Sequence, residues 1–157
     1  WAGTSIGRKA SFFVACAVTP TAEDFDRELD RLKRKIDAGA DFIMSQPLFT
    51  MEQLEEFMDR VGPLPIPHVL GILPLESYRH AELLHNEVPG ITVPLELRER
   101  MRRAGERGKE EGLLIAQEFL EQARRHVAGV YIITSYGRYD VAGELVKQIR
   151  QSERVLT

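Results

Sequence analysis

The sequence predicts an α/β protein of four βα units, which is half of an eight-fold β/α barrel. Apolar runs at residues 12–18, 42–49, 68–75 and 130–136 recur along the 157 residues. Each run ends in small, polar or prolyl residues and leads towards a charged stretch whose apolar positions have helical spacing. That alternation is typical of units that feed a parallel sheet. Four units would supply one side of an active site rather than all of it.

Composition is that of an ordinary globular protein, and it argues against nucleic-acid and membrane partners. Hydrophobic residues make up 43% and charged residues 29%, and the net charge of −3 gives no general attraction for nucleic acid. No apolar run approaches the roughly 20 residues that cross a bilayer, and no basic segment with an apolar signal core begins the chain. We therefore expect one cytoplasmic domain over residues 1–157, without nucleic-acid or membrane partners. Because the chain starts at Trp1, we also expect a fragment of a longer protein.

The cysteine and histidine content argues against disulfides and structural metal. Cys16 is the single cysteine, so no disulfide can form within the chain. Its place in an apolar run predicts a buried, unreactive thiol. The four histidines lack the spacing of zinc ligands, so we expect no metal site.

The first unit combines a strand over residues 12–18 with a helix over residues 22–38. Thr19 and Pro20 end the strand, and a threonine ahead of acidic residues is a helix-start signal. The last turns of the helix gather four basic side chains: Arg31, Lys33, Arg34 and Lys35. On the residues alone, we interpret that basic cluster as a complement to the helix C-terminus rather than as a binding site.

The second unit is a strand over residues 42–49 and a helix over residues 51–61 that Thr50 begins. Gln46 interrupts the apolar run close to the carboxyl end of the strand. In β/α barrels this end carries the chemistry, so Gln46 is a candidate site residue. The alternative is a surface amide at a strand end, and position alone does not separate the two.

The third unit pairs a buried strand over residues 68–75 with a helix that Ser77 caps. Prolines within residues 62–67 stiffen the connection that precedes the strand, because proline cannot continue a helix there. After a loop, a short helix over residues 95–103 and a long helix over residues 109–126 lead to the last strand.

The fourth unit is a strand over residues 129–136 and a helix over residues 139–151. Arg138 lies between them, just past a strand end and next to a helix start. A cation in this place is well positioned to hold an anionic substrate group. The alternative is a surface salt bridge with Asp140 or Glu144, which would contribute little.

The sequence contains none of the motifs that mark common catalytic machinery. It has no P-loop, no GxGxxG, no HExxH and no nucleophile elbow. An aldolase-type barrel would need a catalytic lysine at a strand end, and no predicted strand offers one. We therefore identify no catalytic residue, and an enzyme built on this chain would depend on binding and on a borrowed cofactor.

Several motifs, in the correct order, resemble the methylenetetrahydrofolate reductase family. Residues 32–49, LKRKIDAGADFIMSQPLF, are similar to that family's segment LKxKxxAGAxxxITQxFF. Residues 71–74 resemble its GI(L/F)P strand, and residues 93–94 stand where it has (V/I)P. Residues 134–138 resemble its closing YTLNR. The resemblance extends over residues 12–150.

The resemblance implies the C-terminal half, strands five to eight, of a TIM-type (β/α)8 barrel that binds FAD. In that family NAD(P)H reduces the flavin, and the flavin reduces 5,10-methylenetetrahydrofolate to 5-methyltetrahydrofolate, a step of one-carbon metabolism and methionine biosynthesis. Residues 136–140 look most like the branch that is fused behind a homocysteine S-methyltransferase. The resemblance does not distinguish NADH from NADPH.

The resemblance also implies site residues, each matched to a family position. Gln46 matches a glutamine that contacts the folate pterin and the nicotinamide in turn, and Arg138 matches an arginine at the folate glutamate tail. A guanidinium fork suits such a carboxylate better than a lysine does. His80 is the third substrate contact. The matched cofactor contacts are Thr19, Glu28, Arg31, Arg34 and Lys35, which reverses the first interpretation of the basic cluster.

The chain also departs from the family. Thr19 matches a histidine, and His80 replaces a glutamine, so it can make one hydrogen bond but not an amide's pair. The family's proton-donating glutamate comes from the first four strands. We therefore expect a chain that is inactive alone, binds folate, pairs with an N-terminal half and forms homo-oligomers. The alternative is a non-catalytic half-barrel interaction module that pairs with itself or with such a half, because open sheet edges recruit strands.

Overall fold

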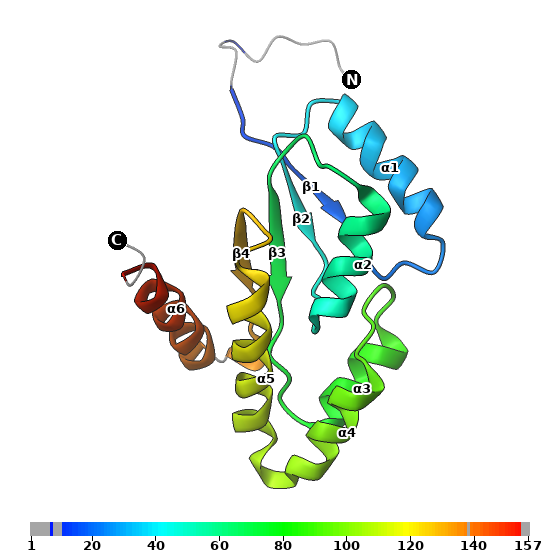
Figure 1. Ribbon diagram of the computed structural model, residues 1–157. Coiled ribbons are helices and arrows are strands. Elements are labelled where there is room, and N and C mark those ends of the chain that lie inside the picture. Colours follow the sequence, from blue (N-terminus) through cyan, green and yellow to red (C-terminus); the bar gives the residue numbers. More distant parts are fainter. Residues whose placement is uncertain (1–6, 8–10, 138, 155–157) are drawn as a thin grey trace.

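The structure, a computed structural model, describes residues 7, 11–137 and 139–154. Its centre is a parallel sheet whose four strands lie side by side in chain order (Figure 1). The strands are β1 (Ala15–Val18), β2 (Phe42–Ser45), β3 (His68–Ile72) and β4 (Gly129–Ile132). Each strand pairs in parallel with the next, so consecutive units are neighbours in space. Together with the layering of the helices, this order fits part of a TIM-type fold rather than a doubly wound one.

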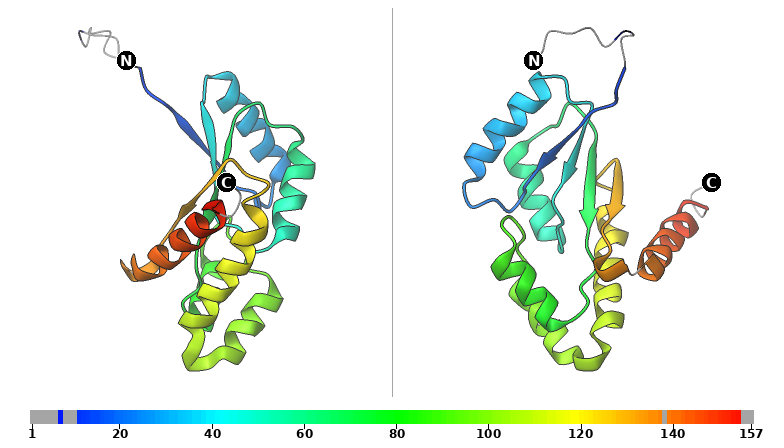
Figure 2. Two further views of the ribbon diagram at one scale, coloured as in Figure 1. Left: turned by 60° about the vertical axis from the view of Figure 1, so that its left-hand side comes forward. Right: turned by 180° about the vertical axis from the view of Figure 1, so that it is seen from behind.

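Helices connect the strands and cover one face of the sheet. They are α1 (Phe25–Asp37), α2 (Met51–Val61), α3 (Tyr78–Glu87), α4 (Leu95–Ala104), α5 (Gly108–Ala123) and α6 (Tyr139–Arg154), with 3₁₀ turns η1 (Gly105–Arg107) and η2 (Ser135–Gly137). The helices α1, α2 and α5 lie against one face, whereas the view from behind shows the opposite face uncovered (Figure 2). The pair α3 and α4 extends beyond the carboxyl ends of the strands (Figure 1). Among the described residues, no helix is both long and apolar enough to span a membrane.

Polar side chains begin the first three helices. Thr50 and Ser77 cap α2 and α3 as predicted, and each hydroxyl oxygen accepts the N–H three residues further on, at 3.4 and 3.1 Å. The predicted start of α1 at residue 22 is wrong. The helix begins at Phe25, because the carboxylate of Asp24, rather than a threonine, takes the cap position and accepts the N–H of Arg27 at 3.1 Å.

The core lies between the sheet and its helices. Alternate strand residues, such as Val18 of β1 and Ile43 of β2, face α1 and α2 and are buried. On the other face Ala15 and Ala17 are exposed. Cys16 is buried on the helical side as a free thiol, and this burial raises its pKa, in agreement with the predicted unreactive cysteine.

The strands lie where the apolar runs predicted them, but they are shorter than the runs. β1 begins three residues late, although Val14 still exchanges two bonds with Asp41: its N–H donates to Oδ2 at 2.7 Å and its oxygen accepts the Asp41 N–H at 2.8 Å. β2 and β3 both end shortly before a proline, Pro47 and Pro74. Proline has no N–H to donate, so the ladder does not continue through it.

Two glycines permit close contacts at the carboxyl end of the sheet. A Cβ on Gly112 of α5 would lie 1.7 Å from the oxygen of Leu75, so this helix packs directly on the loop after β3. A Cβ on Gly71 would lie 2.8 Å from the Ser45 oxygen and 2.9 Å from the Tyr131 hydroxyl. The Tyr131 side chain passes over Gly71 and donates to the Ser45 carbonyl oxygen at 2.8 Å. This bond joins β4 to β2 across β3.

Candidate functional site

The candidate site lies at the carboxyl ends of the four strands, where their following loops meet. In parallel β/α folds this is the face at which ligands bind, because the loops and helix starts converge there. The loop after β1 is tied to the connection between α3 and α4, since the Thr21 hydroxyl donates to the Gly90 oxygen at 2.8 Å. The methyl group of Thr19 lies 2.3 Å from the position of a Cβ on Gly90, so Thr19 contacts the same connection.

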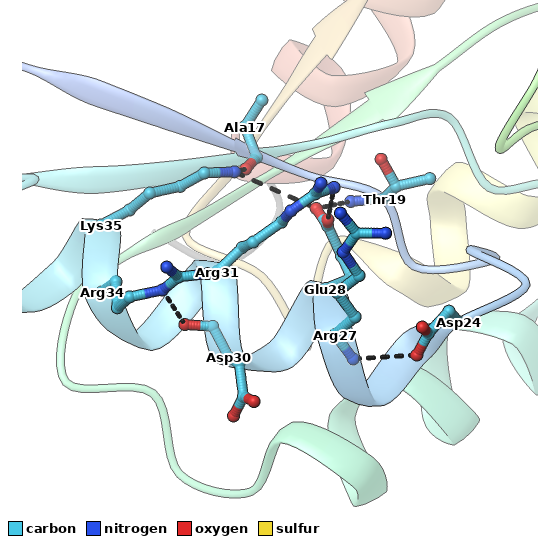
Figure 3. Close-up of polar contacts among 9 residues, drawn as sticks. All are labelled: Ala17, Thr19, Asp24, Arg27, Glu28, Asp30, Arg31, Arg34 and Lys35. Carbon is cyan, nitrogen blue, oxygen red and sulfur yellow. Dashed lines mark hydrogen bonds and ion pairs between the residues drawn. The ribbon is translucent and has the colours of Figure 1, made fainter.

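Three of the five predicted cofactor residues, Thr19, Arg31 and Lys35, contact the carboxylate of a fourth, Glu28 (Figure 3). The backbone N–H of Thr19 donates to Glu28 Oε1 at 3.1 Å. Arg31 Nη1 lies 3.7 Å from Oε2, and Lys35 Nζ lies 4.0 Å from Oε1. Lys35 also donates to the carbonyl oxygen of Ala17 at 2.6 Å. These residues of α1 share one helix face at spacings of three and four, and that face meets the end of β1.

The Glu28 cluster, made of Thr19, Glu28, Arg31 and Lys35, carries an excess of positive charge. The Glu28 side chain is only 10% exposed, whereas the side chains of Arg31 and Lys35 are 48% and 39% exposed. Two partly exposed cations therefore share one buried carboxylate. A guanidinium has five N–H donors and an ammonium three, so both cations retain donors for an added anion.

Arg34, the fifth predicted cofactor residue, lies apart from the Glu28 cluster. Its Nε donates to the carbonyl oxygen of Asp30 at 3.3 Å on its own helix, and its side chain is exposed (Figure 3). The structure thus brings Arg31 and Lys35 to the end of β1 and leaves Arg34 on the solvent side of α1.

Gln46 follows β2 directly and lies beside the loop after β1. Its backbone N–H donates to the Val18 oxygen at 2.8 Å, which continues the pairing of Val18 with Ser45. The residue is exposed. Its amide is therefore available at the carboxyl edge of the sheet, next to Thr19 in the neighbouring loop.

His80 lies in the first turn of α3 and is 9% exposed. Its Nδ1 accepts the backbone N–H of Glu76 at 3.2 Å, and its Nε2 lies 3.3 Å from the hydroxyl oxygen of Ser135. Burial lowers the pKa of His80, against an opposing effect of the Glu76 charge. The imidazole thus bonds to the protein through both nitrogens. Arg138, the predicted contact of the folate tail, lies outside the described residues.

A buried polar group in the middle of the sheet is not among the predicted site residues. His68, at the start of β3, is 6% exposed and places Nε2 at 2.9 Å from the hydroxyl oxygen of Ser45. Its ring packs edge-on against Phe57 of α2, with the centroids 5.4 Å apart. Burial lowers the pKa of His68 to about 4. A histidine that begins an apolar run is a signal of such burial, but the partner on another strand is visible only in the fold.

Comparison with known proteins gives a consistent picture. The family model described as methylenetetrahydrofolate reductase matches residues 9–135. A probable methylenetetrahydrofolate reductase (NADPH) from Caenorhabditis elegans is 34% identical over 88 residues, which cover 50% of this chain and 13% of that protein. Methylenetetrahydrofolate reductase 1 from Schizosaccharomyces pombe is 33% identical over 58 residues, which cover 36% and 10%. The matched segments are therefore a small part of these relatives.

A solved structure resembles this fold more extensively. It is an uncharacterized protein from Clostridium thermocellum that binds two copies of 5-methyl-5,6,7,8-tetrahydrofolic acid. The two superpose with a TM-score of 0.56 over 85% of this chain and 51% of that chain, at 15% sequence identity. At 15% identity this likeness shows a similar fold and nothing about function.

Proposed function

The chain belongs to the methylenetetrahydrofolate reductase family, and on that premise we propose that it supplies the C-terminal half of a (β/α)8 barrel. The complete barrel reduces 5,10-methylenetetrahydrofolate to 5-methyltetrahydrofolate with FAD and NAD(P)H. This chain contributes binding and orientation, and it is inactive alone. A fused homocysteine methyltransferase remains part of the same proposal.

The uncovered face of the sheet supports the half-barrel. Four parallel strands in chain order with helices on one side have the layering of a barrel wall (Figure 2). Within the described residues, each of the two outer strands has a strand neighbour on one side only. The segment before β1 is apolar and exposed, with Phe12 and Phe13 at 78% and 77%. A second half of the barrel would cover this face and these side chains.

The Glu28 cluster supports a site for the diphosphate of FAD. Bound FAD would supply a ring system that accepts a hydride from a nicotinamide and delivers it to the folate. Lys35 and Arg31 would offset the charge of the diphosphate, because both retain donors beside a single buried carboxylate. Thr19 and Glu28 would shape the same end of β1. Arg34 would need a different rotamer to join them.

The substrate side of the proposal rests on Gln46 and Arg138. The exposed Gln46 amide, which offers both donors and an acceptor, would contact the pterin and the nicotinamide in turn. Arg138 would pair with a carboxylate of the folate tail. His80 lies at the rim of the same edge. Hydride transfer demands close approach of donor and acceptor, so orientation by such groups carries much of the rate.

The family match over residues 9–135 carries this proposal, and flavin binding tests its cofactor part. FAD is titrated into the chain, alone and together with the N-terminal barrel half of a family member, while flavin fluorescence is recorded. Lys35→Ala should weaken binding by about tenfold or more, because a charge-assisted contact is lost. Lys33→Ala, an exposed lysine of the same helix, is the matched control and should bind as the unchanged chain does. An absence of flavin binding, even with the N-terminal half supplied, contradicts the cofactor assignment.

The second candidate function is a non-catalytic half-barrel module that pairs with itself or with an N-terminal half. The exposed Phe12 and Phe13 and the uncovered sheet face favour it. Sedimentation equilibrium distinguishes the two ideas. A homo-oligomer that binds neither FAD nor folate would favour the module, whereas a strict monomer would count against it.

A further inference from the structure

His80 connects two loops at the carboxyl edge of the sheet. Its Nδ1 accepts the N–H of Glu76, in the loop after β3, at 3.2 Å. Its Nε2 lies 3.3 Å from the hydroxyl of Ser135, which begins η2 after β4. The two loops follow neighbouring strands, yet they are separated by about sixty residues of α3, α4 and α5 along the chain. The imidazole is thus a short link between segments that the sequence holds far apart.

The hydrogen bonds determine which nitrogen of His80 carries the proton. A backbone N–H can only donate, so Nδ1 must present its lone pair to Glu76. The proton of the neutral ring therefore lies on Nε2, and the Ser135 hydroxyl accepts it. The backbone of His80 is fixed as well, because the backbone N–H of His80 donates to the Ser77 hydroxyl that caps α3. A fixed tautomer on a capped helix start is a rigid support.

We propose that His80 is a positioning residue, which fixes η2 against α3 as the neutral Nε2–H tautomer, rather than a side chain that binds substrate through its nitrogens. Both nitrogens already bond to the protein, so an added ligand would meet the carbon edge of the ring. Outside the ring lies a cavity of about 250 Å³, lined by Ser77, Arg79, His80 and Leu83. This inference deepens the proposed function and rests on it only for the folate measurement below.

The tautomer can be observed directly in the chain labelled with ¹⁵N-histidine at neutral pH. We expect Nδ1 of His80 to show the chemical shift of an unprotonated imidazole nitrogen and Nε2 that of a protonated one. The opposite tautomer, or an averaged mixture of both, overturns the proposal.

Two isosteric variants separate the hydrogen bond to Glu76 from the hydrogen bond to Ser135. His80→Gln keeps an amide where Nε2 lies and can still reach Ser135, whereas His80→Asn keeps an amide where Nδ1 lies and reaches Glu76 alone. We expect amide hydrogen exchange in residues 133–137 to accelerate by about tenfold in His80→Asn and in Ser135→Ala, and to stay close to the unchanged chain in His80→Gln. Exchange in α2 is the internal control. Equal exchange in the Asn and Gln variants contradicts the link to η2.

Titration with 5-methyltetrahydrofolate, the product of the proposed reaction, then tests the consequence for folate binding. Binding should weaken by about tenfold in His80→Asn and should be restored in His80→Gln, because η2 borders the proposed folate site. If the Asn variant binds folate as well as the unchanged chain, His80 does not position the site. If the unchanged chain binds no folate, either alone or together with the N-terminal barrel half of a family member, the proposed function fails. The tautomer and exchange measurements still decide the role of His80.

Discussion

Acid should destabilise this fold, and the buried His68 should contribute to that loss of stability. The side chain is 6% exposed, its Nε2 bonds to the Ser45 hydroxyl at 2.9 Å, and its ring packs on Phe57. Burial lowers its pKa from 6.5 to about 4, so the folded state holds His68 neutral where the unfolded chain takes up a proton. At about 1.4 kcal/mol per pH unit, this difference corresponds to about 3 kcal/mol of unfolding free energy.

The sign follows from which state binds more protons. Because the pKa is lower in the folded state, the stabilisation is fully present above pH 6.5, declines as the pH falls towards 4 and changes little below that value. Urea unfolding of the chain, followed by circular dichroism at intervals from pH 7.5 to pH 4, measures this decline.

A matched pair of variants isolates the His68 contribution. His68→Gln keeps a polar group within reach of Ser45 but cannot be protonated. Its unfolding free energy should therefore fall by about 3 kcal/mol less than that of the unchanged chain over the same pH interval. The exposed His126 provides the control, and His126→Gln should follow the unchanged chain. Parallel pH dependence in all three proteins would refute the reasoning. So would a ring titration of His68 by NMR with a midpoint near 6.5.

Two further predictions concern packing and reactivity. Gly112→Ala should destabilise the chain by roughly 2–3 kcal/mol in urea unfolding, because its Cβ would lie 1.7 Å from the Leu75 oxygen. Gly143→Ala in α6, where a Cβ meets nothing within 4 Å, should instead be stabilising by roughly 0.5–1 kcal/mol, and a similar loss in both would contradict the packing argument. The buried Cys16, whose pKa is raised by desolvation, should react with a thiol reagent only as fast as the chain unfolds, and rapid labelling of the native chain would show the burial to be incorrect.

The sequence predicts elements better than it predicts where they end. Helical spacing and caps locate α2 and α3 closely, because Thr50 and Ser77 act within their own turns. Strand ends are less accurate, since an apolar run shows burial but not where ladder hydrogen bonds stop. Leu73 and Leu75 remain buried although β3 has already ended at Ile72. Burial and pairing are separate properties, and only burial is visible in composition.

The candidate site was predictable in part for a similar reason. The resemblance matches Glu28, Arg31 and Lys35 to one cofactor site; their spacing of three and four puts them on one helix face, and in the structure they lie together. Neither spacing nor resemblance could show that Lys35 reaches a backbone oxygen of β1 or that Arg34 turns back to its own helix. The Lys35 contact depends on how α1 crosses β1, which is a tertiary property, and the Arg34 contact depends on the rotamer that its side chain adopts on α1.

The contacts of Lys35 and Glu28 also decide how far another strand could pair with β1. The oxygens of Val14 and Val18 accept bonds from the β2 side, so the alternating groups of Ala17 and Thr19 point to the outer edge. There, Lys35 donates to the Ala17 oxygen and Glu28 accepts from the Thr19 N–H, much as a neighbouring backbone would. In the described part of the chain, an incoming strand meets free backbone as far as Ala15 and then meets these two side chains. The side chains of α1 thus set the register at which another strand can pair with the outer edge of β1. They also prevent such pairing along the whole length of β1, which has no charged residues of its own.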